Sequence, residues 1–373
     1  MNEFSDGNRV VYLVMRNTAG IEDIKERLAR VGEADDRIVV HFREDDASGT
    51  RYVPVNEVLE KISERAVDYR LVVENKRGDR SMCAVSRFYG GLGDIVSMYP
   101  SILTIATRYE KVYLFIPQIY HFFFRNIPNV ECHDHTHTFR RGTNIGLLKI
   151  RYPHLYNRCG VIYDLFCPAI RYEMQTNYKP KKSRLEVFAD AFKVEPEPPR
   201  ISFPPPTFDL PSPVVGFNLF SMNRSKDWPI IRVRSVCQEL VKQGINVVTM
   251  DMDVGIAEAR SYVDMTVEEL CSMISALDCM VSTDTGPFHV AGACGIPVVG
   301  LFGPTDGALT AKHYENVKVI HDQRDDACFR PCYFATTNRY RCANNIGDCM
   351  KDIKAEQVID AVMAIVSGEG LVV

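Results

Sequence analysis

The sequence predicts an α/β protein with two parallel-sheet halves, preceded by a smaller α/β segment. Short apolar runs of strand length alternate with longer amphipathic segments along most of the 373 residues, as in parallel sheets with crossover helices. Eight of the 20 prolines lie between residues 196 and 213, a density that excludes helix and central strand. A chain of this length also exceeds the usual size of one core. We therefore expect two domains around a cleft, joined by a proline-rich connector.

The first 80 residues form the expected N-terminal α/β extension. Apolar runs and helical periodicity predict three strands and two helices in alternation. In order, these elements cover residues 9–15, 20–31, 37–42, 55–66 and 69–74.

Residues 81–195 form the expected first parallel-sheet domain. A strand at 83–88 leads through a glycine turn into a helix at 94–109 and a second strand at 111–116, which is a complete strand-helix-strand unit. From there to residue 195 the alternation of strands and helices is less clear. The connector then covers 196–213.

Residues 214–373 form the expected second domain, in which strands and helices alternate again. Strands are predicted at 214–220, 246–251, 279–283 and 297–302, and helices at 230–244, 266–277, 287–295 and 355–366. Ligands of such sheets bind at the carboxyl ends of the strands. We therefore expect the site where these ends meet the cleft.

Composition excludes several classes of protein. The net charge of −4 gives no global basic field of the kind that a general nucleic-acid binder needs. No apolar run approaches the length of a membrane span, and the first ten residues lack the pattern of a secretory signal. We expect a cytoplasmic protein whose cysteines are mostly reduced thiols.

The stretch STDTGPFHVAGACG, residues 282–295, places polar residues where a strand gives way to a helix. The amides of Thr285 and Gly286 would lie in the first turn of that helix, where unpaired N–H groups and the helix dipole favour a phosphate or diphosphate. Asp284 and Thr285 are also ordinary helix-capping residues. From this stretch alone, an anion site and a simple cap are both open.

Three separated segments together resemble the bacterial heptosyltransferases, glycosyltransferase family 9. STDTGPFHVAGACGIPVVGLFGPTD (282–306) is similar to the family's carboxyl-terminal signature. RFYGGLGDIVSMYP (87–100) resembles its opening Gly-x-Gly-Asp turn, and NRSKDWP (223–229) its Lys-x-Trp-Pro segment. The resemblance covers residues 83–366 and leaves the extension unexplained. It implies the GT-B architecture of two facing Rossmann-like domains, with the acceptor on the first and the nucleotide sugar on the second.

The resemblance implies that a sugar is transferred from a nucleotide-diphosphate donor with inversion, in one displacement. The acceptor hydroxyl must lose a proton, so a carboxylate is needed as general base. Asp94 is our candidate, next to an acceptor-side glycine loop that contains Gly91 and Gly93. The alternative is that Asp94 only caps the helix that follows.

The donor side is expected around the 282–295 stretch. Lys226, with the amides of Thr285 and Gly286, would neutralise the leaving diphosphate, so that no metal or other cofactor is required for catalysis. Asp284 would orient the loop, because two anions repel each other. Pro287 and His289 complete the donor-binding set, and His289 either reaches the diphosphate or packs.

The sequence indicates the identity of the donor and the acceptor less clearly. The resemblance suggests an ADP-activated heptose, with the nucleobase near Met250 and Met265 unless both are core residues. The expected acceptor is a polysaccharide or lipopolysaccharide hydroxyl, which would bring the protein to the inner-membrane surface; a protein or a modified DNA base is the alternative. His133, His135 and His137 form a loop more readily than a metal site, and Arg140 and Arg141 suit an anionic acceptor.

Four of the 12 cysteines lie within 22 residues, at Cys328, Cys332, Cys342 and Cys349. Their spacing is looser than that of a zinc ribbon. A structural zinc or iron ion, free thiols and disulfides therefore remain as alternatives. Any metal held there would stabilise the loop and take no part in the chemistry.

Two further function classes compete with a glycosyltransferase. A nicotinamide-dependent oxidoreductase is disfavoured, because GGLGD at 90–94 lacks the full G-x-G-x-x-G spacing. A non-catalytic nucleotide-sugar binding subunit would keep Lys226 and Thr285 but would need no base, so Asp94 argues against it.

Overall fold

A computed structural model describes most of the chain. The described residues are 3–6, 9–14, 38–46, 49–54, 71–87, 90–134, 144–165, 172, 180–206, 211–221, 224–321 and 348–368. Contacts divide the chain into one unit of residues 1–69 with 170–180, and a larger unit of residues 70–169 with 181–373. None of the helices in the described part has the length and hydropathy that a membrane crossing requires.

The first unit contains a four-stranded sheet of order β1-β2-β3-β4. Its strands are β1 (Glu3–Asp6), β2 (Arg9–Val14), β3 (Ile38–Asp46) and β4 (Gly49–Pro54). β2 and β3 pair in parallel, which the predicted strands at 9–15 and 37–42 anticipate, whereas β1 and β4 add antiparallel edges that were not predicted. The helices expected at 20–31 and 55–66 lie outside the described residues.

The second unit begins with a five-stranded sheet of order β5-β9-β6-β7-β8. Its elements are β5 (Leu71–Glu74), β6 (Asp79–Ser86), α3 (Leu92–Ala106), β7 (Lys111–Ile116), the 3₁₀ helix η1 (Gln118–Phe123), β8 (Val130–Asp134), α4 (Asn144–Arg151), α5 (Pro153–Arg158), β9 (Cys159–Asp164) and α7 (Arg184–Phe192). β6 to β9 are parallel, and β5 pairs antiparallel with β9. β5 was expected to close the extension, so this sheet starts before the boundary predicted at residue 80.

Alternate residues of this sheet enter two cores. Val112, Leu114 and Ile116 of β7 pack with α3 and α7, whereas Tyr113 and Phe115 face the side of α4 and α5. Both faces of this strand are buried, so its residues form the continuous apolar run from which a strand at 111–116 was predicted.

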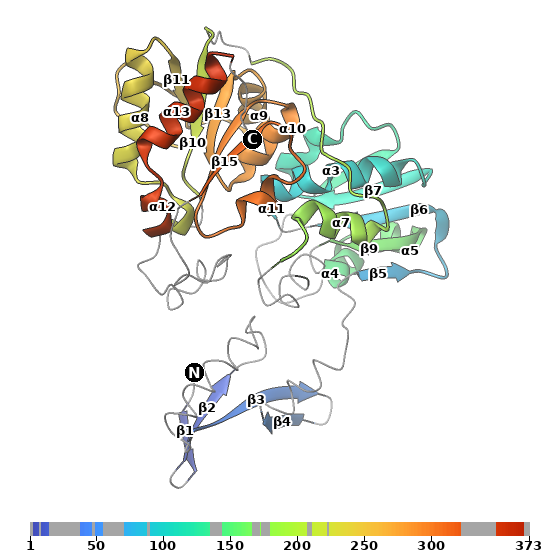
Figure 1. Ribbon diagram of the computed structural model, residues 1–373. Helices are drawn as coiled ribbons and strands as arrows, with labels where there is room; N and C mark the ends of the chain where they lie inside the picture. The colour runs from blue at the N-terminus through green and yellow to red at the C-terminus, as the bar shows by residue number, and fades with distance from the viewer. Residues whose placement is uncertain are drawn as a thin grey trace. The chain divides into compact units, whose positions relative to one another are not determined.

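The same unit ends with a six-stranded parallel sheet of order β12-β11-β10-β13-β14-β15. Its elements are β10 (Val214–Asn218), η2 (Arg224–Lys226), α8 (Ile230–Lys242), β11 (Asn246–Thr249), β12 (Arg260–Ser261), α9 (Val267–Ile274), β13 (Cys279–Thr283), α10 (Gly286–Cys294), β14 (Val298–Phe302), α11 (Gly307–Ala311), β15 (Val317–His321), α12 (Asp348–Asp352) and α13 (Ala355–Val366). In chain order the strands run 3-2-1-4-5-6, the Rossmann order, with its switch point between β10 and β13. α8 and α13 cover one face and α9 and α10 the other (Figure 1).

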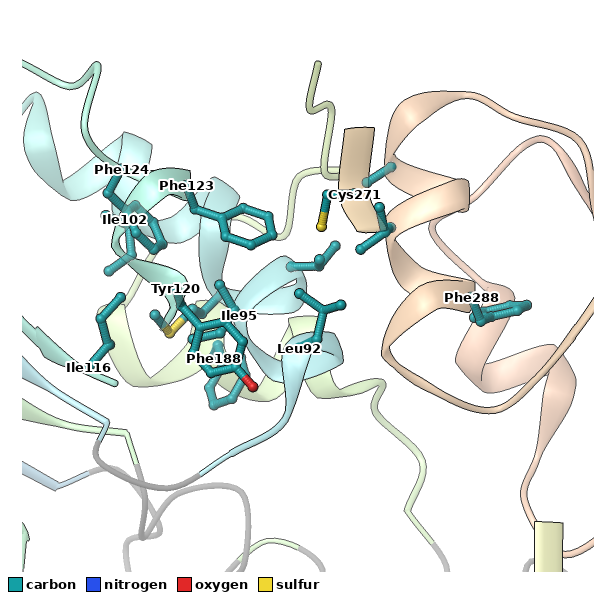
Figure 2. Packing of buried hydrophobic residues seen from close by; sticks show 14 of the residues in the cluster. Leu92, Ile95, Ile102, Ile116, Tyr120, Phe123, Phe124, Phe188, Cys271 and Phe288 are labelled. Atoms are coloured by element: carbon teal, nitrogen blue, oxygen red, sulfur yellow. The ribbon is translucent and has the colours of Figure 1, made fainter. Parts of the chain in front are cut away.

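The two sheets of the second unit meet through α3 and α10. One apolar core contains Leu92 and Ile95 of α3 together with Phe288 and Val290 of α10. Figure 2 shows Leu92 pointing from α3 toward α10, and Phe123 pointing toward Cys271. The predicted fold class, α/β with two parallel-sheet Rossmann-like halves, is confirmed.

The proline-rich connector forms neither helix nor strand in its described residues, 196–206 and 211–213. It is nevertheless fixed to both halves. The Ile201 amide donates to the Ala293 carbonyl at the end of α10 (3.0 Å). The Phe203 ring packs edge-on against Phe123, with centroids 5.5 Å apart.

Candidate active site

The α10 N-terminus lies at the switch point of the C-terminal sheet. Thr285 is the N-cap residue of α10, but no side chain caps the first turn of this helix. The Thr285 hydroxyl instead donates to Asn218 Oδ1 at the end of β10 (2.9 Å). Thr285 therefore takes the N-cap position without capping through its side chain, and the first-turn amides of α10 keep their capacity to bind an anion.

Pro287 fits this arrangement. Gly286 and Pro287 are the first two residues of α10, positions where a missing N–H costs the helix no hydrogen bond. The ring of Pro287 restricts the backbone of the first turn, and the free N–H groups of that turn belong to Thr285 and Gly286 on one side and Phe288 on the other.

Lys226 is held beside this helix start. It is only 8% exposed, which excludes a surface role. Its Nζ lies 2.8 Å from Asp284 Oδ2 and donates to the Asp284 carbonyl at 3.2 Å. Asp284 thus holds the lysine in place, and its expected role in orienting the loop stays a prediction.

Asp94 lies in the first turn of α3, three residues after the N-cap Gly91. Its Oδ2 accepts the Gly91 N–H at 3.2 Å, so Asp94 supports the cap and is not the N-cap residue itself. The same oxygen pairs with Arg87 (2.7 Å to Nη2), and Oδ1 lies 3.6 Å from Arg184 Nε. Two arginines therefore hold a carboxylate that capping alone would not require.

Two glycines bring the starts of α3 and α10 into contact. A Cβ on Gly93 would lie 2.6 Å from Cδ2 of His289, and a Cβ on Gly286 would lie 2.6 Å from Cβ of Leu92. Such distances exclude any side chain unless the helices move apart. The close approach sets Asp94 on one half of the unit next to His289 on the other.

The two carboxyl groups of the site, Asp94 and Asp284, both have lowered pKa values. Burial raises the pKa of Asp94, but Arg87 and Arg184 outweigh it and the net pKa is lowered. The pKa of Asp284 is likewise lowered on balance, because Lys226 and then His289 outweigh its burial. Both carboxylates are ionised at neutral pH.

His289 has contacts with both halves of the unit. Its ring edge packs on Gly93, and its Nδ1 lies 2.9 Å from the hydroxyl oxygen of Tyr314. Burial lowers its pKa more than Asp284 and Asp94 raise it. His289 is therefore neutral at pH 7, and one edge of its ring packs on Gly93, while contact with the diphosphate stays a prediction.

Four residues of the site escaped the sequence reasoning. Arg87, Arg184, Asn218 and Tyr314 come from four different segments, and only the fold brings them to Asp94, Thr285 and His289. Arg87 alone carried a sequence signal, because it is a charged residue in the apolar run predicted as a strand at 83–88 and begins the RFYGGLGD motif.

Other candidates lie elsewhere or outside the described residues. Met250 is buried in the core against Gly216, and Met265 packs on the same core. His133 pairs with Glu131 at 3.0 Å and stacks on Phe115. The residues that lie outside the described part are His135, His137, Arg140, Arg141, Cys328, Cys332 and Cys342.

Cys349 on α12 is buried next to Gly303. Among the described residues no group of three or more His, Cys, Asp or Glu side chains is arranged to hold a metal ion. The structural zinc or iron ion at the four cysteines stays a prediction.

Replacing Gly286 by alanine tests the helix contact. The new Cβ would meet Leu92 at 2.6 Å, and we expect overpacking to lower the free energy of unfolding by about 1–3 kcal/mol. Urea denaturation measures the loss. Gly91→Ala is the control, because a Cβ there meets nothing within 4 Å; equal losses in the two variants would contradict the contact.

Comparison with known proteins identifies the domain. Residues 164–335 match the model of glycosyltransferase family 9, the heptosyltransferases. Over these residues the chain is similar to the family 9 glycosyltransferases. The match includes Lys226 and the whole β13–α10 segment of this glycosyltransferase, whereas Asp94 lies before it. A comparison with curated protein sequences finds no significant match.

Solved structures share the fold of the glycosyltransferase. A glycosyltransferase family 9 protein from Veillonella parvula is 13% identical, with a TM-score of 0.56, and covers 79% of this chain and 99% of its own. ADP-heptose lipopolysaccharide heptosyltransferase II of Escherichia coli is 16% identical, with a TM-score of 0.53 and coverages of 77% and 99%. The iron-containing dodecameric glycosyltransferase TibC from enterotoxigenic E. coli is 16% identical, with a TM-score of 0.59 and coverages of 79% and 78%.

Proposed function

We propose that this glycosyltransferase moves a heptose from an ADP-heptose-type donor onto an acceptor hydroxyl, with inversion and in a single displacement. The observation that carries the proposal is the contact of two helix starts. One, α10, offers an anion site with Lys226 beside it, and the other, α3, presents an ionised carboxylate. A leaving group and a base are the two requirements of a direct displacement.

The donor diphosphate would bind at the start of α10. There the amides of Thr285 and Gly286 and the Lys226 ammonium would meet the negative charge that grows as the sugar leaves. Among the described residues the site gathers three cations (Arg87, Arg184 and Lys226) and two carboxylates (Asp94 and Asp284). The excess positive charge favours a diphosphate, and charge neutralisation by the protein supports a reaction that needs no catalytic cofactor.

Asp94 would take the proton from the acceptor hydroxyl. Gly91 has open space around its Cα, so the α3 side of the site offers room for the acceptor near the base. A carboxylate on α3 and a diphosphate on α10 approach the anomeric carbon from different halves of the unit, which is consistent with inversion.

The acceptor we favour is a hydroxyl of a polysaccharide or lipopolysaccharide, since the heptosyltransferase II of similar fold is an ADP-heptose lipopolysaccharide enzyme. A protein or a modified DNA base is the alternative acceptor. The cytoplasm, with the inner-membrane surface as the place of work, remains the expected location.

Thermal unfolding with a panel of nucleotides tests the donor class. A ligand at 100 times its Kd stabilises the folded state by about 2.7 kcal/mol, so we expect ADP-heptose and ADP to raise Tm clearly. UDP- and GDP-sugars and NAD are the comparison ligands. A rise with NAD and none with any nucleotide sugar would support the oxidoreductase alternative and refute the proposal.

A further inference from the structure

The two ring nitrogens of His289 differ in their partners. Its Nδ1 lies 2.9 Å from the Tyr314 hydroxyl oxygen. Its Nε2 lies 3.9 Å from Asp284 Oδ1, which is beyond hydrogen-bond range. No other partner of Nε2 is found among the described residues, so this nitrogen is available to a ligand at the α10 start.

The direction of the Tyr314 hydrogen bond decides where the imidazole proton sits. Burial raises the pKa of the Tyr314 phenol far above neutrality, so the hydroxyl keeps its proton. In the described part of the chain its one hydrogen-bond partner is His289 Nδ1. A buried hydroxyl satisfies its proton only by donating it, and Nδ1 therefore accepts. A neutral imidazole that accepts at Nδ1 carries its proton on Nε2.

We propose that Tyr314 is a positioning residue that holds His289 in the Nε2–H tautomer, so that neutral His289 donates a hydrogen bond to the donor diphosphate bound at α10. The part of this proposal that concerns the diphosphate rests on the proposed function. The part that concerns the tautomer rests on the contacts of the protein alone.

The Tyr314 ring is itself locked against α10. A Cβ on Gly292, one turn after His289, would lie 2.6 Å from the Tyr314 ring. Phe288 meets the same ring edge-on, with centroids 5.9 Å apart. The glycine provides the room for the tyrosine, and the tyrosine hydroxyl then reaches Nδ1.

The charged groups around His289 balance each other. Asp284 and Asp94 favour the protonated ring, whereas Lys226 and Arg184 oppose it, and burial opposes it most. The neutral ring follows from this balance. A neutral ring would be an ambiguous ligand for phosphate, since either nitrogen can carry the proton, and Tyr314 removes the ambiguity.

The tautomer can be measured without any ligand. In ¹⁵N-histidine spectra of the free protein at pH 7, we expect two well-separated His289 nitrogen shifts, with the proton on Nε2. His289→Gln assigns the signals. In Tyr314→Phe we expect averaged shifts and a ring that protonates at higher pH. An Nδ1–H tautomer or an averaged pair of shifts in wild type would overturn the proposal.

ADP binding tests the consequence for the ligand. We expect Tyr314→Phe to raise the Kd of ADP about 2- to 10-fold at pH 8, the equivalent of one net hydrogen bond. The ratio to wild type should fall toward one as the pH is lowered through the pKa of His289, because a protonated ring carries a proton on Nε2 in either variant. A ratio that does not change with pH would mean that Tyr314 only packs.

Two further variants complete the test. In a His289→Gln background, whose amide donates without help, Tyr314→Phe should have little further effect on ADP affinity; an undiminished effect would contradict the proposal. Tyr109→Phe removes a comparable hydroxyl contact, 2.9 Å from Tyr163, and should leave ADP affinity unchanged. If ADP does not bind to wild type, the proposed function fails, while the nitrogen spectra still decide the tautomer.

Discussion

Asp94→Asn is expected to lower sugar transfer by about 10²- to 10⁴-fold, the usual cost of losing a general base. Asparagine keeps the size of the side chain and can still accept the Gly91 N–H. It cannot take the acceptor proton. Nucleotide affinity should persist, because the diphosphate site belongs to α10. The measurements are nucleoside diphosphate release with donor and acceptor present, and ADP affinity.

Glu186→Gln is a matched control for this variant. Glu186 stands at the same helix position on α7 as Asp94 on α3, accepts the N-cap amide of Ser183 at 2.7 Å and pairs with a cation, Lys312. It thus shares the capping and ion-pairing roles of Asp94. If the two variants lose activity equally, Asp94 has a structural role only, and the base must be sought among other carboxylates.

Protonation of Asp94 should not lower kcat/KM in the mildly acidic range. The pKa of Asp94 is raised by burial but lowered on balance by Arg87 and Arg184. A carboxylate with a lowered pKa loses its base form only when the pH falls through that lower value, so kcat/KM should hold from pH 8 to about 5. The arginines also make Asp94 a weaker base than an isolated aspartate, because its pKa is lowered.

Lys226→Met is expected to lower turnover by about 10²- to 10³-fold, the scale seen when one preorganised electrostatic donor is removed. Methionine keeps the buried stem of the side chain and removes the ammonium. Donor affinity should fall less than turnover, because the charge on the diphosphate grows during the reaction. Steady-state kinetics at saturating donor measure the difference.

The double variant Lys226→Met with Asp284→Asn separates catalysis from pairing. Loss of Lys226 alone leaves the carboxylate of Asp284, 15% exposed, without the cation 2.8 Å away, and this costs stability. Neutralising both residues should recover much of the stability but none of the turnover. Recovery of turnover in the double variant would show that Lys226 serves only to pair with Asp284.

Sequence patterns located the elements that are bounded by turn residues. The strands at 111–116 and 279–283 and the helix at 355–366 have the predicted limits, because apolar runs there end at proline, aspartate or serine. β12 and α11 were missed, since they are only two and five residues long. β5 was assigned to the wrong sheet, because the period of a strand does not reveal its partner.

The site residues also fall into those with a local sequence signal and those without one. Lys226 and Thr285 could be found from the sequence, because each lies in a short motif whose neighbouring residues indicate a phosphate site. Arg184 and Tyr314 carry no local signal, since each gains its role from a partner 90 and 25 positions away in the chain. The same holds for the Nε2 proton of His289, which follows from a tertiary contact.

The apolar core that joins α3 to α10 couples the two halves of the larger unit at the candidate site. Residues of both halves, among them Leu92 and Phe288, belong to a single buried cluster, although each half also has a buried cluster of its own on the far face of its sheet. Partial unfolding that separates the helices would expose this surface to water. A change that moves α3 away from α10 would therefore disturb the base and the diphosphate site together.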